Sequence, residues 1–181
     1  MAARNETYVA LLRGINLGSR NRVAMADLRA LVTGLGHEDV STYLQSGNVV
    51  FRAAGRAADL RLALEGGIRG ELGLDVTVLL RTKGELATLV AGNPFTEKAK
   101  APTTLHVTFL AEAPKRARIR DLDPRVGEPD EFRVAGRDVY LHCPNGYGRS
   151  KLGNALFERR LGVAATTRNW KTVTSLAELA A

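Results

Sequence analysis

Five short polar segments hold most of the residue types in this chain that could bind a ligand. They are residues 13–18, 45–48, 93–95, 145–151 and 168–170. Their side chains are mainly amides, hydroxyls and cations, which can hydrogen-bond to an anion or a polar ring. Loops held by a rigid scaffold are where binding groups usually lie. None of the five matches the motif of a known reaction, so they predict binding without assigning chemistry.

Apolar periodicity predicts the elements that position these segments. In the first half the pattern indicates a strand at 8–12, a helix at 25–35, paired strands at 40–44 and 48–52, a helix at 60–72, a strand at 76–80 and a short helix at 84–91. The second half repeats this order, with a strand at 105–109, a helix at 114–122, a hairpin at 132–143, a helix at 152–161, a brief strand at 163–166 and a last helix from Trp170.

The repeated order predicts an α+β protein made of two ferredoxin-like (βαββαβ) halves from a duplication. We expect mostly antiparallel sheets with helices packed on one face, and halves that pack closely. The halves span 1–92 and 93–181, the second including the C-terminal helix, with a boundary at 93–102 that contains Pro94 and Pro102.

The topology predicts which loops meet. In a ferredoxin-like half, the first and third strands are antiparallel neighbours, so the end of one lies beside the start of the other. This brings Arg13 and Asn16 next to Gln45, Ser46 and Asn48. The same loop leads into a helix N-terminus, where free N–H groups favour negative charge. We call this predicted group the first cluster.

A second cluster is predicted where Asn93 lies beside the segment that contains Arg149, Ser150 and Lys151. Ser150 is a candidate cap for the following helix. The order Ser150-Lys151-Leu152 differs from a Walker loop, which ends in Gly-Lys-Ser/Thr, and this argues against an NTPase. Arg168 completes the candidate ligand-binding residues, at the predicted start of the last helix, where Asn169 is a candidate cap.

The residues needed for several common reactions are missing from these patterns. His106 and His142 are expected to share a sheet face, but no further ligand has the spacing of a metal site. No nucleophile, base and acid can be placed as a triad. We therefore predict no metal and no cofactor, and name no catalytic residue. With one cysteine, Cys143, no internal disulfide can form, which favours a reducing cytoplasmic location. No apolar run approaches the ~20 residues of a membrane span.

Net charge leaves a second class of function open. The chain has a formal charge of +7 and a pI of about 10.0. The excess lies mainly in the second half, where 15 Lys and Arg face 10 Asp and Glu. Basic proteins favour polyanions, so nucleic acid is an alternative partner. A third alternative is an enzyme of unknown reaction in which Lys151 or a histidine carries a proton.

The polar segments also resemble a bacterial family known as domain of unknown function 1697. The resemblance covers nearly the whole chain and is carried by residues 8–18, 45–51, 93–95, 148–152 and 167–170. It implies a compact α+β protein of two related halves and no established activity. Ala24 and Lys171 depart from the residues common in that family. The leading hypothesis is therefore a cytoplasmic protein that binds a small anionic or nucleotide-like ligand on its polar loops. Neither the oligomeric state nor the ligand is predicted.

Overall fold

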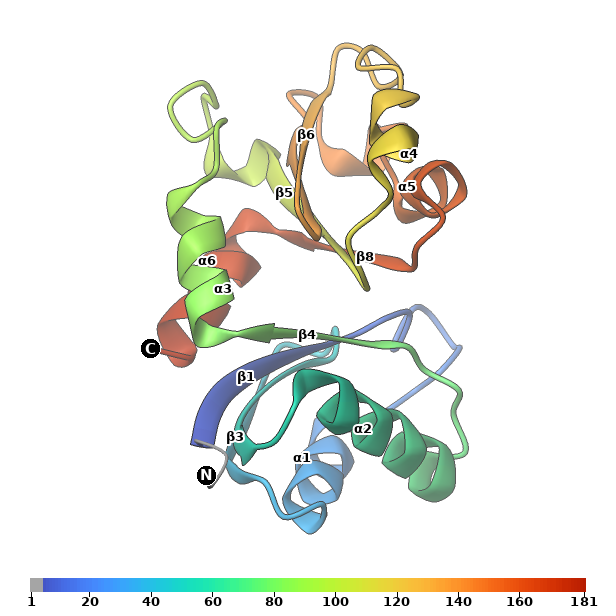
Figure 1. Ribbon diagram of the computed structural model, residues 1–181, viewed down its shortest axis with the longest axis vertical. Helices are drawn as coiled ribbons and strands as arrows, with labels where there is room; N and C mark the ends of the chain where they lie inside the picture. Colours follow the sequence, from blue (N-terminus) through green and yellow to red (C-terminus); the bar gives the residue numbers. More distant parts are fainter. Residues whose placement is uncertain (1–4) are drawn as a thin grey trace. The chain divides into compact units, whose positions relative to one another are not determined.

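A computed structural model describes residues 5–181 and contains two four-stranded antiparallel sheets (Figure 1). The first sheet has the strand order β2-β3-β1-β4, in which β1 pairs with both β3 and β4. Helices α1 and α2 lie on one face of this sheet. The elements are β1 (Asn5–Leu12), α1 (Met25–Gly34), β2 (Glu38–Tyr43), β3 (Asn48–Ala54), α2 (Ala57–Leu72) and β4 (Val78–Thr82).

The second sheet repeats this topology, with the order β6-β7-β5-β8. Its elements are β5 (Leu105–Leu110), α4 (Arg116–Arg120), β6 (Glu131–Ala135), β7 (Asp138–His142), α5 (Asn154–Leu161) and β8 (Ala165–Asn169). Helix α3 (Lys83–Ala91) follows the first sheet and α6 (Trp170–Leu179) follows the second. The predicted fold class, two ferredoxin-like halves from a duplication, is confirmed.

The chain divides into two compact units. The first contains the described residues up to Ala87 together with Leu176–Ala181, and the second contains Thr88–Ser175. Helices α3 and α6 therefore each contain residues of both units.

Side chains of alternate strand residues point to the same face of the sheet, and the helices of the first unit cover the face that carries this apolar set. In the first unit, Tyr8, Ala10 and Leu12 of β1 belong to the core that also contains Leu31 of α1 and Leu64 of α2. Helix α2 ends where Gly73 adopts a left-handed conformation with φ 67°, a common helix stop.

The core of the second unit is built in the same way from one face of its sheet. Leu110 of β5 and Leu141 of β7 cluster with Phe157 and Leu161 of α5. Ile119 of α4 packs against this cluster, which turns the rest of that short helix toward solvent. Among residues 5–181, no helix has both the length and the apolar character needed to cross a membrane.

Three local predictions were wrong. His142 lies opposite Leu105 and His106 lies opposite Leu141, so the two histidines point to opposite faces of the sheet. Helix α5 begins at Asn154 with Gly153 as N-cap, and the Ser150 hydroxyl instead accepts from the Leu152 amide at 3.0 Å. The last strand runs through Asn169, which places Arg168 inside a strand rather than at a helix start.

Candidate functional site

The two segments of the first cluster meet as predicted. Strands β1 and β3 pair with Leu11 opposite Asn48, and the Leu12 amide donates to the Gly47 carbonyl at 2.9 Å. This pairing places the loop after β1 against the turn before β3. The geometric basis of the first cluster is therefore confirmed.

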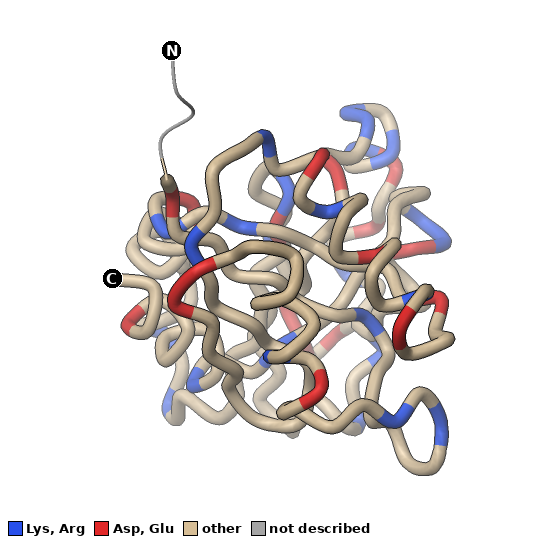
Figure 2. The backbone as a smooth tube through the Cα atoms, turned by 90° about the horizontal axis from the view of Figure 1, so that it is seen from below, with Lys and Arg blue, Asp and Glu red and all other residues tan. Residues whose placement is uncertain are grey.

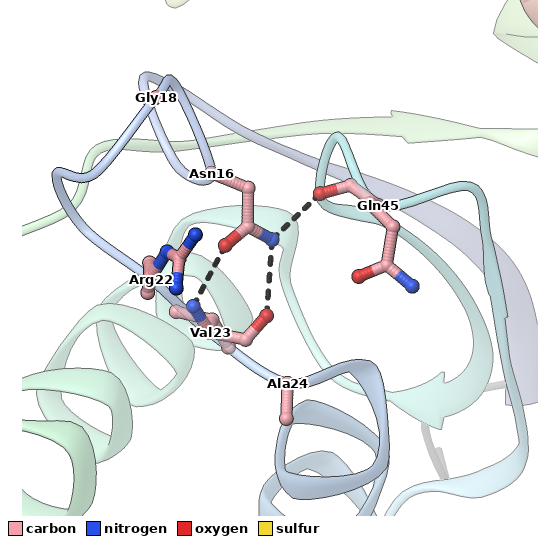
Figure 3. Close-up of a pocket in the computed structure, with 6 residues that line it drawn as sticks. All are labelled: Asn16, Gly18, Arg22, Val23, Ala24 and Gln45. Carbon is pink, nitrogen blue, oxygen red and sulfur yellow. Dashed lines mark hydrogen bonds between the residues drawn. The ribbon is translucent and has the colours of Figure 1, made fainter.

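Asn16 ties three backbone segments together (Figure 3). Its Nδ2 donates to the Gln45 carbonyl at 2.7 Å and to the Val23 carbonyl at 3.0 Å. Its Oδ1 accepts from the Val23 amide at 2.8 Å. Asn16 adopts a φ of 52°, a left-handed conformation that asparagine tolerates better than most residues. Asn16 thus fixes the loop after β1, the turn before β3 and the approach to α1.

Close packing at Gly47 also holds the loop after β1 against the turn before β3. A Cβ on Gly47 would lie 2.6 Å from Cδ1 of Ile15 and 2.9 Å from Cβ of Leu12, and the residue has a φ of 77°. Only glycine combines this conformation with such a close approach. The buried Ile15 side chain therefore anchors the loop directly against the turn.

These segments line an open hollow of about 410 Å³, which we call the Asn16 hollow. Figure 3 shows the guanidinium of Arg22 on one side of Asn16 and the side-chain amide of Gln45 on the other. Ala24 is the N-cap of α1 and has no side chain that could cap the helix. The lining residues are Asn16, Gly18, Arg22, Val23, Ala24 and Gln45, and none of them is acidic.

The other residues predicted for the first cluster have structural roles. Asn48 is fully buried, and its Nδ2 donates to the Tyr43 carbonyl at 2.8 Å and to the Ser46 hydroxyl at 2.9 Å. Arg13 is partly buried, and its amide donates to the Thr77 carbonyl at 2.9 Å. Arg13, Ser46 and Asn48 do not line the Asn16 hollow. Of the predicted first cluster, Asn16 and Gln45 line it, joined by Arg22 from the same loop.

Two of the four residues predicted for the second cluster line a smaller hollow of mixed charge, with a volume of about 220 Å³, and Asn93 and Ser150 do not. Arg149 and Lys151 line it together with Glu128 and Asp130. Two carboxyl groups beside two cations make this hollow a poorer match for an anion than the Asn16 hollow. Its other lining residues are Gly127, Pro129, Asn145 and Gly146.

Asn93 is not part of the lining of this second hollow. Its Oδ1 accepts from the Phe95 amide at 3.0 Å, and the Phe95 ring stacks on His142 with ring centroids 6.0 Å apart. Asn93 is buried. Its side chain thus shapes the turn that anchors Phe95 against the end of β7.

Arg168 is buried in strand β8 and bound to its own strand. Its Nη1 donates to the Thr166 hydroxyl at 2.8 Å and to the Thr167 carbonyl at 3.0 Å. Burial lowers the pKa of Arg168 to about 10. Arg81 of β4 is the matching residue of the first sheet, since Arg81 faces Val9 and Arg168 faces Val107 in the two central strands. These arginines belong to the repeated scaffold.

A third hollow, of about 560 Å³, lies beside Trp170 in the second unit and was not predicted. His106, which stacks on Tyr147 with centroids 4.7 Å apart, lines it with Trp170 and Lys171. Burial lowers the pKa of His106, and Trp170 is itself buried. As predicted from the sequence, Asn169 caps α6, because its Oδ1 accepts from the Thr172 amide at 2.8 Å.

No group of three or more histidine, cysteine, aspartate or glutamate side chains within residues 5–181 is arranged to hold a metal ion. The single thiol, Cys143, is fully buried, and burial raises its pKa to about 11. A buried neutral thiol is a poor nucleophile.

Comparison with known proteins supports the fold and the family. The model of a family described as "protein of unknown function (DUF1697)" matches residues 6–140. A solved structure of the conserved bacterial protein SP0830 from Streptococcus pneumoniae is similar, with a TM-score of 0.78 and 22% sequence identity, and the match covers 98% of this chain and 100% of that one. At this identity the similarity concerns the fold. No curated protein matches the sequence.

Proposed function

We propose that this chain, which belongs to the DUF1697 family, binds a small anionic or nucleotide-like ligand in the Asn16 hollow. The observation that carries the proposal is the composition of that hollow, which contains one cation, one exposed side-chain amide and a helix start, and has no acidic residue in its lining.

Arg22 supplies the charge for binding. It is exposed, and it has no ion-pair partner within residues 5–181. Its guanidinium can therefore form charge-assisted hydrogen bonds to an anion without first breaking a salt bridge. The fixed fork of donors in arginine suits phosphate and carboxylate groups.

Gln45 and the start of α1 supply neutral groups. The backbone carbonyl of Gln45 accepts from Asn16, which leaves its exposed side-chain amide over the hollow (Figure 3). An amide offers both a donor and an acceptor, as the edge of a nucleobase requires. The first turn of α1 adds backbone N–H groups and the positive end of the helix dipole.

Preorganisation strengthens the proposal. Asn16 and Gly47 fix the loops before any ligand arrives, so binding does not have to order these segments. Rigid sites lose less conformational entropy on binding than flexible loops do.

The test is calorimetric titration of the full chain with inorganic phosphate, pyrophosphate and AMP. We expect Arg22→Gln to weaken the tightest of these interactions at least tenfold, because a hydrogen bond to a charged group contributes about 1.5–3 kcal/mol. Gln45→Ala should weaken AMP more than phosphate.

Arg20→Gln is the matched control. Arg20 is exposed on the same loop but does not line the hollow, so this substitution removes the same charge two residues away. We expect it to change affinity less than twofold. Equal losses in Arg20→Gln and Arg22→Gln would contradict a defined site, and a loss confined to Lys151→Gln would place the ligand in the second hollow instead.

A further inference from the structure

A basic surface lies on helices α4 and α5 of the second unit. It shares no residue with the Asn16 hollow. The two helices lie side by side on the same face of their sheet (Figure 1). We call the cations they expose the arginine surface. It consists of Lys115, Arg116, Arg118, Arg120, Arg159 and Arg160, all of them exposed.

Packing explains why these cations face solvent together. Ile119 packs into the core of the second unit, and so do Phe157 and Leu161 of α5. Arg118 and Arg120 flank Ile119, and Arg159 and Arg160 lie between Phe157 and Leu161; all four are exposed. Arg118 of α4 and Arg159 and Arg160 of α5 line one hollow of about 310 Å³, with Asp121 as the single acid in its lining.

The cations of the arginine surface lack ion-pair partners. Within residues 5–181, no carboxylate lies within salt-bridge distance of any of the six. Four arginines of the first unit behave differently, because each pairs with a carboxylate. These pairs are Arg52–Asp39, Arg56–Asp59, Arg61–Glu65 and Arg69–Asp75.

Charge along most of the backbone is mixed, with acidic and basic positions interspersed (Figure 2). The segment 115–120 is an exception, since it has four cations and no acid. A gathering of unpaired like charges is electrostatically unfavourable for the isolated protein. Such a surface is complementary to a partner that carries many negative charges.

We infer that the arginine surface binds the sugar–phosphate backbone of duplex nucleic acid without reading its sequence. The cations extend over two helices, beyond the hollow that one small anion would fill. Arginine side chains of this kind contact phosphates and set position rather than base specificity. The two helices expose no aromatic side chain, since Phe157 is fully buried. Stacking on the bases of single strands, the usual device of single-strand binders, therefore has no platform here.

The experiment measures fluorescence anisotropy of a labelled 20-base-pair DNA duplex of arbitrary sequence with the full chain at several salt concentrations. A variant with Arg118→Gln, Arg120→Gln, Arg159→Gln and Arg160→Gln removes four charges from the surface. Each lost phosphate contact should reduce the slope of log affinity against log salt by about 0.9. We therefore expect a slope shallower by about 3–4 and at least a tenfold loss of affinity at low salt.

The matched control removes four charges from the first unit, through Arg52→Gln, Arg56→Gln, Arg61→Gln and Arg69→Gln. We expect it to retain most of the wild-type salt slope, although it has the same net charge as the first variant. Circular dichroism establishes that both variants remain folded.

Equal losses in the two variants would overturn the inference, because overall charge alone would then account for binding. Absence of binding by the wild type at low salt would also overturn it. Tighter binding to a single strand of the same length than to the duplex, or binding to anionic lipid vesicles without binding to the duplex, would contradict the assigned partner. Repeating the titration with duplex RNA shows whether the surface prefers the sugar–phosphate backbone of RNA or of DNA. Binding to either duplex supports the inference.

Discussion

Replacing Asn16 with alanine should destabilise the first unit by about 4 kcal/mol. The substitution removes three hydrogen bonds to backbone groups, two to carbonyls and one from the Val23 amide. At about 1 kcal/mol each, these bonds contribute about 3 kcal/mol. Alanine at a φ of 52° adds about 1 kcal/mol of backbone strain.

Asn21→Ala provides a matched comparison within the same loop. Asn21 also adopts a left-handed conformation, with a φ of 48°, but within the described residues its side chain forms a single hydrogen bond, from Nδ2 to the Gly14 carbonyl at 3.1 Å. The same reasoning gives a loss of about 2 kcal/mol for this variant. The difference of about 2 kcal/mol between the two variants isolates the two additional bonds of Asn16.

Urea unfolding followed by circular dichroism measures this difference. With a typical m value of about 2 kcal/mol per molar, the midpoint of Asn16→Ala should lie about 1 M below that of Asn21→Ala. Hydrogen exchange at the Val23 amide, which donates to Asn16, should accelerate in the first variant only. Equal midpoints would refute the view that Asn16 holds the three segments together.

Further predictions concern buried groups and close packing. Gly47→Ala should destabilise the chain by about 2 kcal/mol more than Gly14→Ala, because both have a left-handed φ but a Cβ at Gly47 meets Ile15 at 2.6 Å, whereas one at Gly14 meets nothing within 4 Å; equal midpoints in urea would contradict this. Cys143 is fully buried and its pKa is raised to about 11, so a thiol reagent at pH 8 should react with it only after unfolding. Rapid labelling of the native protein would show that the site opens. Burial lowers the pKa of His106 below 6.5, so the unfolded chain binds this proton more readily, and the free energy of unfolding should fall as the pH drops below about 6.5. His106→Gln should show a smaller fall, and an unchanged pH dependence would exclude this histidine as its source.

Periodicity predicted the strands and helices because their core faces are apolar. Strand β8 shows where that signal ends, since the run Ala165–Asn169 is mainly polar and contains the buried Arg168. Its position follows from hydrogen bonding to β5, which places Arg168 opposite Val107. A sequence pattern does not reveal that register, and the same limitation explains why His106 and His142 were assigned to one face.

The first cluster could be predicted in outline because strand order alone brings its loops together. The side chains that face a ligand could not be predicted, because they depend on which polar groups already form hydrogen bonds within the protein. Asn48 begins β3 and Asn16 lies in the loop after β1; they are the same residue type, yet Asn48 is fully buried and Asn16 lines the hollow. Arg22 lines the hollow next to Val23, whose backbone carbonyl and amide both bind Asn16, and the sequence pattern does not reveal these bonds.

The two units share the same sheet topology, and they differ in the segment that joins the first strand to the first helix and in the residues that the helices expose. Both central strands face an arginine in the last strand, Arg81 or Arg168, so these positions belong to the repeat. In the first unit a long loop joins β1 to α1 and folds over the sheet end to form the Asn16 hollow. In the second unit β5 reaches α4 through residues 111–115 alone, too short a segment to form a similar loop, and the basic residues gather on the helices instead. Because the two proposed sites use different parts of the repeat, Arg22→Gln should leave duplex binding intact, and the four substitutions on α4 and α5 should leave binding of the small anion intact.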